Sequence, residues 1–97
     1  MNVPMHDLLL IRSDGDYSKV HLEDGQVFYQ KTTMKEWETL LRPPHFLRVH
    51  KSAIVALPKA IAIDRTGGNW TLQIRGSDQL VPVGRSYRPA IRQHLQF

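Results

Sequence analysis

The segment from Phe46 to Leu57 constrains the fold more than any other part of the chain. It reads FLRVHKSAIVAL, two apolar runs around a polar turn at 48–52. The first run, through Val49, predicts a strand that enters a turn. The unbroken apolar run that starts at Ala53 predicts a strand buried on both faces. The sequence therefore predicts a turn that is held rigidly between two core strands and presents polar groups.

Short apolar runs separated by turn signals continue along the rest of the chain. The strands expected outside the 46–57 segment are 8–11, 17–22, 27–29, 60–63, 70–74 and 80–83. The turns at 13–16 and 23–25 join neighbouring runs closely enough for hairpins, which favours an antiparallel meander. Pro82 suits an edge strand or a bulge, because proline has no backbone N–H to donate to a neighbouring strand.

Two short helices complete the prediction. Thr33 is a candidate N-cap, and Glu36 three residues later completes a capping box. An apolar stripe follows at Met34, Trp37, Leu40 and Leu41. The Pro43-Pro44 pair ends this helix, because the residue before a proline is pushed out of the α region. Residues 87–95 predict a second helix. The fold class is therefore mainly β, a small antiparallel multi-sheet domain with two short helices. It spans 1–97 as one domain, with 1–6 as a flexible N-terminal segment.

The composition argues against several classes of function. The chain has no Cys, so it offers no disulfide, thiolate zinc site or thiol nucleophile. Its five His lack a close metal-binding spacing. No catalytic triad, carboxylate pair or phosphate loop is evident, so we expect no enzyme activity, no metal and no cofactor. No apolar run approaches the length of a membrane span, and we see no signal peptide. We therefore expect a cytoplasmic protein without a membrane partner.

Positive charge is concentrated in the second half of the chain. The net charge is +4, yet residues 42–97 carry nine of the 13 Lys and Arg and only two of the nine Asp and Glu. This half also holds the polar turn at 48–52. A basic face is the expected footprint of a polyanion partner, although many small domains are mildly basic without binding one.

Three segments resemble the LytTR family of DNA-binding domains, which occur in bacterial transcription regulators. The family pattern of an aromatic residue, then Arg, His and Ser at alternate positions, is matched by Phe46, Arg48, His50 and Ser52. The segment LVPVGRSY at 80–87 is similar to the closing strand of the family, and DGDYSKVH at 14–21 is similar to its first hairpin. The three matches follow the family order over residues 8–95.

The resemblance implies sequence-specific binding of double-stranded DNA through loops inserted into the major grooves. It also implies that a pair of domains binds two DNA repeats, that binding often bends the duplex, and that the parent protein is a response regulator of a two-component system with a receiver domain. The DNA-binding residues that it suggests are Ser18, Lys19, Arg48, His50, Lys51, Ser52, Arg85 and Arg88.

Four of these candidate DNA-binding residues have different expected roles. Arg85 follows Gly84 at a strand end, and Arg is the best bidentate reader of guanine, but it could also be a solvated strand-end residue. Lys51 stands where many family members carry Asn; a Lys can contact a phosphate or a minor-groove acceptor but lacks the paired donor and acceptor of an amide. We expect His50 to structure the turn. Arg48, on the same face of the strand, is a candidate phosphate clamp.

The remaining candidates have equally plain structural alternatives. Ser52 could stabilise the turn or donate to a phosphate. Ser18 and Lys19 are the expected contacts of the first hairpin, whereas Tyr17 is expected at the edge of the core. Arg88 flanks the DNA or is merely solvated.

Two other functions fit a small basic β domain. A single-stranded nucleic acid or RNA module would need aromatic residues exposed on one sheet face, and the candidates Tyr29, Trp70 and Tyr87 are scattered. Trp37 and Trp70 are most simply core residues. A strong preference for single strands over duplex would support the single-stranded module. A protein-interaction domain would make the basic half incidental, and removing Arg85 would then leave DNA binding unchanged because there would be none.

Overall fold

The computed structural model describes residues 4–95 and confirms a mainly β fold with two short α-helices. In chain order the elements are β1 (Leu8–Asp14), β2 (Tyr17–Leu22), β3 (Val27–Gln30), α1 (Met34–Leu40), β4 (Phe46–His50), β5 (Ala53–Ala56), β6 (Ala60–Asp64), β7 (Trp70–Ile74), β8 (Leu80–Val83) and α2 (Arg88–His94). Short 3-10 turns join several of them. Of the N-terminal segment expected to be flexible, Met5 and His6 form one such turn, η1 (Met5–Asp7), and residues 1–3 lie outside the described range.

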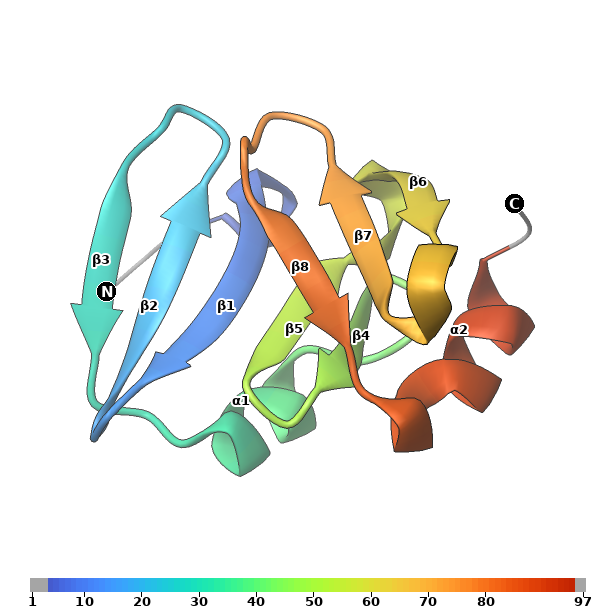
Figure 1. The fold of residues 1–97 in the computed structure, drawn as a ribbon. Coiled ribbons are helices and arrows are strands. Elements are labelled where there is room, and N and C mark those ends of the chain that lie inside the picture. Colours follow the sequence, from blue (N-terminus) through green and yellow to red (C-terminus); the bar gives the residue numbers. More distant parts are fainter. Residues whose placement is uncertain (1–3, 96–97) are drawn as a thin grey trace.

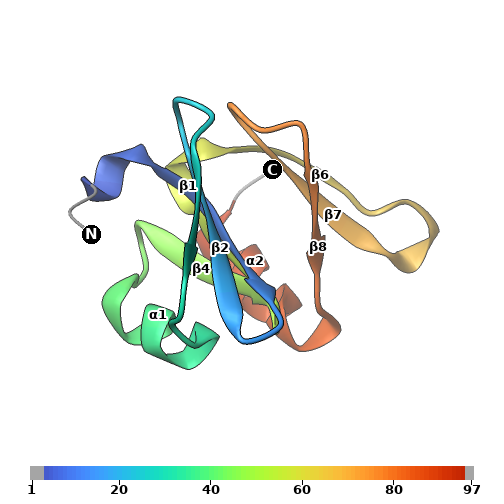
Figure 2. The same ribbon diagram turned by 90° about the vertical axis from the view of Figure 1, so that its left-hand side faces the viewer.

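The strands form two antiparallel sheets. One sheet has the order β3-β2-β1-β5-β4, and the other has the order β6-β7-β8 (Figure 1). Pro82 lies on β8 at an edge of the smaller sheet, as predicted. Figure 2 shows the larger sheet between α1 on one side and the smaller sheet on the other. Both faces of the larger sheet are therefore covered at its central strands, whereas Val27 and Tyr29 of the edge strand β3 are exposed.

This arrangement explains why β5 is apolar at every position. Ala53 and Val55 belong to the core between the two sheets, which Trp70 and Leu72 of β7 and Ile91 of α2 also enter. Alternate residues of a strand point to opposite faces, so the residues between them face the other way. Ile54 and Ala56 accordingly belong to a second core beneath α1. The prediction of a strand buried on both faces is confirmed.

Helix α1 covers the second core. The predicted capping box is present, with the Glu36 backbone N–H donating to Thr33 Oγ1 at 3.1 Å and the Thr33 N–H donating to the Glu36 carboxylate at 3.2 Å. Met34 and Trp37 are buried, but Leu40 is 64% exposed, so its place in the apolar stripe was predicted wrongly. The reason is geometric, because a residue six positions after Met34 points well away from the face it shares with Trp37. Within residues 4–95, no helix has the length and hydropathy needed to cross a bilayer.

Candidate nucleic-acid interface

Three connections meet along one edge of the molecule. They are the β1–β2 turn (14–17), the β4–β5 turn (50–53) and the segment after β8 (84–87), and together we call them the loop edge. Figure 1 shows them along the lower side of the molecule. The Ser13 N–H donates to the Ser52 carbonyl at 3.0 Å, and the Gly84 N–H donates to the Val49 carbonyl at 2.8 Å. Backbone hydrogen bonds therefore hold the first and third connections against the second.

Arg48 braces the β4–β5 turn from inside. Its Nη2 donates to the Lys51 carbonyl at 2.6 Å, and its Nη1 pairs with Glu38 of α1 at 3.1 Å. Its Nε lies 3.4 Å from the His50 carbonyl. The strand also carries a bulge here, because the register with β5 shifts between Arg48 and His50. The structure thus directs this guanidinium toward the turn backbone and α1, a different role from the outward phosphate clamp that the sequence suggested.

His50 and Ser52 close the same turn on each other. The Ser52 backbone N–H donates to His50 Nδ1 at 3.1 Å, and the Ser52 hydroxyl lies 2.8 Å from the same nitrogen. An imidazole nitrogen that accepts an N–H must be unprotonated. Burial lowers the pKa of His50 below its usual value, and the charges of Lys51, Arg12 and Arg48 lower it further. The geometry supports the structural role expected for His50 and gives Ser52 a similar one.

Lys51 and Arg85 are the exposed cations of the loop edge. Lys51 lies at the tip of the β4–β5 turn, and Arg85 opens the 3-10 turn η4 (Arg85–Tyr87). Gly84 sets the position of Arg85, because a Cβ on Gly84 would lie only 2.9 Å from Cδ2 of Tyr87 and 3.6 Å from Cδ2 of His50. A small residue thus lets the end of β8 pack directly against the β4–β5 turn.

The first hairpin differs from the sequence prediction. Ser18 is 1% exposed, and its hydroxyl donates to the Thr32 carbonyl, so it fastens β2 to the segment before α1 instead of facing outward. Tyr17, expected at the core edge, is 48% exposed at the end of the hairpin. Lys19 is half-buried, with Nζ 5.9 Å from the centre of the Tyr29 ring. The alternation of side chains along a strand could have predicted the burial of Ser18, because Ser18 points to the same face as the buried Val20.

Arg88 is held beside the loop edge by distant parts of the chain. Its guanidinium lies over the Trp70 ring, with Cζ 4.6 Å from the ring centre, and its Nη2 donates to the Gly68 carbonyl. Trp70 is buried, which confirms its assignment to the core. The structure therefore gives Arg88 a packing role that the sequence could not show, since β7 and α2 are far apart in sequence.

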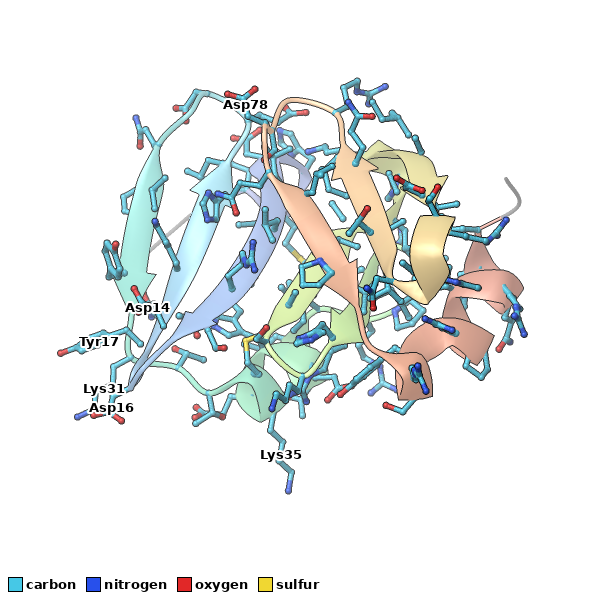
Figure 3. All side chains as sticks on the ribbon, viewed as in Figure 1. Asp14, Asp16, Tyr17, Lys31, Lys35 and Asp78 are labelled. Atoms are coloured by element: carbon cyan, nitrogen blue, oxygen red, sulfur yellow. The ribbon has the colours of Figure 1, made fainter. Side chains whose placement is uncertain are left out.

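Two lysines near the loop edge were not predicted as site residues. Figure 3 shows Lys31 at the hairpin tip with Asp16 and Tyr17, and Lys35 projecting from α1 on the same side of the molecule. Both lysines are exposed. Only their charge marks them in the sequence, and the surrounding first half of the chain is acidic overall. Among residues 4–95, no three His, Asp or Glu side chains gather as a metal site would require.

Comparisons with known proteins agree with this geometry. The family model of the LytTr DNA-binding domain matches residues 1–96. The solved LytTr DNA-binding domain from Bacillus cereus superposes with a TM-score of 0.86 at 26% identity, covering all of this chain and 88% of that one.

Two curated relatives are transcription regulators that sense carbon monoxide. The CO-responsive transcriptional regulator RcoM of Rhodospirillum rubrum is 37% identical over 86 residues, which are 88% of this chain and 36% of that protein. The heme-containing CO-sensing transcriptional regulator RcoM 2 of Paraburkholderia xenovorans is 27% identical over 94 residues, or 96% of this chain and 35% of that protein. The chain thus spans about a third of the length of these relatives. With the family model matching nearly its whole length, the chain belongs to the LytTR family of DNA-binding domains of transcription regulators.

Proposed function

We propose that this domain binds double-stranded DNA through its loop edge, placing side chains of rigid turns in the grooves. The observation that carries the proposal is that cationic side chains without partners in the described part of the chain extend from a backbone that is held in place. Lys51 and Arg85 are exposed, and neither side chain has a hydrogen bond or ion pair within residues 4–95. Their backbones are joined through the bond between Gly84 and Val49. The backbone that carries these cations is fixed before DNA arrives, so binding has to order only the two side chains.

The dimensions of the molecule suit a contact that spans more than one groove. Its longest axis measures 37 Å, close to the helical repeat of roughly 34 Å that separates successive major grooves on one side of B-DNA. The hairpin tip with Tyr17 and the η4 turn with Arg85 lie toward opposite ends of the loop edge (Figure 1). We infer that these two connections enter successive major grooves and that Lys51 faces the minor groove between them.

The site residues then divide by task. Arg85 reads a base, most favourably guanine through a bidentate pair. Tyr17 and Lys19 are the contacts of the first hairpin, and Lys51 binds a phosphate or a minor-groove acceptor. Arg48 and His50 keep the turn in shape. Ser52 does the same through its backbone bond to His50, while its hydroxyl adds a phosphate contact if it turns outward.

Lys31 and Lys35 add phosphate contacts on the hairpin side. Lys31 lines an open groove of about 680 Å³ between the β1–β2 turn and the start of α1, together with Asp16 and Glu36. Carboxylates on this side limit how closely the backbone of DNA can approach. We therefore expect the larger electrostatic contribution from the half of the loop edge that holds Lys51 and Arg85.

We further propose that the domain acts in the cytoplasm as the DNA-binding part of a longer regulator without catalytic activity of its own. Two such domains would occupy two DNA repeats. A receiver domain is one candidate for the remainder of the parent protein. The names of the two RcoM relatives favour a second candidate, a gas-sensing module, because both of those regulators respond to carbon monoxide.

Selection from a random duplex pool tests the proposal. The domain, an Arg85→Ala variant and an Arg75→Ala control are compared at about physiological salt, since Arg75 is also exposed but follows β7 at the other end of the molecule. We expect a short motif that the Arg85 variant loses at one position and the control retains. Better retention of single strands would support the single-stranded alternative. No retention of either would favour a protein-interaction domain.

A further inference from the structure

A cluster of arginines surrounds Trp70 next to the loop edge. The Cζ atoms of Arg65, Arg88 and Arg92 lie 4.8, 4.6 and 5.2 Å from the centre of its ring. Trp70 itself is 7% exposed, because it belongs to the core between the sheets and the three arginine side chains lie over its ring. They come from the loop before η3 (Thr66–Gly68) and from α2, which the chain brings together in space (Figure 1). Three like charges thus converge within 5.2 Å of one point.

The charges of this cluster are not balanced by nearby acids. Within residues 4–95, no carboxylate forms an ion pair with any of the three arginines. The neighbouring Asp64 turns its carboxylate to the Thr66 backbone N–H at 2.8 Å. Arg88 donates from Nη2 to the Gly68 carbonyl, and its buried Nε has no hydrogen-bond partner. Converging guanidinium groups without a counter-charge repel one another, and an anion placed among them would relieve that repulsion.

Stacking prepares these arginines for a phosphate. A guanidinium that lies on an aromatic face keeps its N–H groups at the edge, where they can still donate. The indole ring also restricts the motion of the long side chains, so less entropy is lost when a phosphate is bound. Arg65 and Arg92 are the exposed members, and Arg88 is half-buried.

The cluster is continuous with the loop edge. Arg88 follows Arg85 by one turn of helix, and its bond to Gly68 brings η3 against the start of α2. A duplex that carries on past the base read by Arg85 would therefore run alongside Arg65 and Arg92. We propose that these two arginines, held on Trp70, bind phosphates of the DNA flank and extend the footprint beyond the three loops. This inference rests on the proposed function.

Salt dependence measures the proposed contact directly. Each phosphate contact contributes about 0.9 to the slope of log affinity against log salt. An Arg65→Gln/Arg92→Gln double variant should therefore lower the slope by about 1.8. The ratio of the DNA affinity of the unaltered domain to that of the variant should then fall about twelvefold between 50 and 200 mM salt. Glutamine keeps part of the apolar stem that covers Trp70. Melting temperatures of the variants verify that the domain still folds.

Matched variants separate this inference from the proposed function. Arg75→Gln removes the same charge just beyond the far end of β7, roughly 16 Å from Trp70, and should leave the slope nearly unchanged. The double variant should weaken binding to a selected site and to unrelated duplex by the same factor, because phosphates carry no sequence information. Arg85→Ala should instead reduce the difference between those two DNAs.

Shortening the duplex gives an independent test. Removing the flank beyond the base read by Arg85 should lower the DNA affinity of the unaltered domain to that of the double variant. The affinity of the double variant itself should not change when the flank is removed. An Arg65→Lys/Arg92→Lys variant should keep most of the slope, because it keeps both charges. A double variant whose slope equals that of Arg75→Gln, or one that is as sensitive to flank length as the unaltered domain, would overturn the inference. The proposed function would stand in either case if Arg85→Ala loses the motif at one position.

Discussion

Replacing Arg48 by Gln tests the division between residues that position the loop edge and residues that contact DNA. The strongest bond lost is from Nη2 to the Lys51 carbonyl at 2.6 Å, and a hydrogen bond from a charged donor contributes about 1.5–3 kcal/mol. The pair with Glu38, whose side chain is 50% exposed, adds at most about 1 kcal/mol. The contact from Nε at 3.4 Å is too long to add much.

The expected loss of unfolding free energy is therefore about 2 kcal/mol. For a domain of this size, that loss corresponds to a fall of about 8–16 °C in melting temperature. Glu38→Gln removes only the exposed ion pair and should cost about 0.5 kcal/mol. If the freed turn has to be reordered on DNA, the same 2 kcal/mol weakens binding of Arg48→Gln by up to about thirtyfold.

Thermal melting and DNA titrations at several salt concentrations decide between the two roles. A positioning residue makes no contact with phosphate, so Arg48→Gln should lose affinity by one factor at every salt concentration. A phosphate contact would instead lower the salt slope by about 0.9. Glu38→Gln would then also bind DNA more tightly, because the carboxylate that competes for Arg48 would be gone. A lower salt slope for Arg48→Gln, or tighter DNA binding by Glu38→Gln, would refute the positioning role if the melting temperature of Arg48→Gln is also unchanged.

Three further outcomes are expected from the structure. Ser18→Ala should cost about 1–2 kcal/mol, seen in thermal melting, because it removes the bond to the Thr32 carbonyl, and it should leave the salt slope of DNA binding unchanged. Gly84→Ala should weaken DNA binding more than it lowers the melting temperature, because its Cβ at 2.9 Å from the Tyr87 ring must displace the segment that carries Arg85. Stability should fall below pH of about 6.5. Burial, followed by nearby cations, lowers the pKa of both His21 and His50 in the folded chain. As the pH falls, the unfolded chain therefore binds protons at these histidines before the folded chain does, and the free energy of unfolding decreases. A melting temperature that rises between pH 7.5 and 5.5 would contradict this last expectation.

Local sequence signals predicted the elements of the fold well. The apolar run from Ala53, the turn signals and the capping box at Thr33 each act within a few residues, and the structure contains the elements that they predict. Leu40 was predicted wrongly because it was assigned to the stripe by its spacing of six residues from Met34, which on an α-helix does not return to the same face. Its neighbour Leu41 completes the buried face, and one face of a short helix has no room for both.

The site was harder to predict because each candidate had several possible partners. Arg48, Arg85 and Arg88 are all cations beside a turn or a strand end in the sequence. The structure separates them by what lies opposite: Arg48 meets the turn carbonyls, Arg88 meets Trp70 and Gly68, and Arg85 meets solvent. Those partners come from other elements, so no local pattern could assign them.

In the first hairpin, the position of a residue along the strand predicts its exposure better than its residue type does. Ser18 and Lys19 have the polar groups expected of DNA contacts, whereas Tyr17 has the apolar ring expected of a core. Strand parity argues the opposite, because Ser18 shares a face with Val20 and that face is buried beneath α1. The observed exposures follow parity. A rigid recognition surface needs both kinds of position, since the buried Ser18 hydroxyl fixes the strand and its exposed neighbour Tyr17 is thereby held out toward the partner.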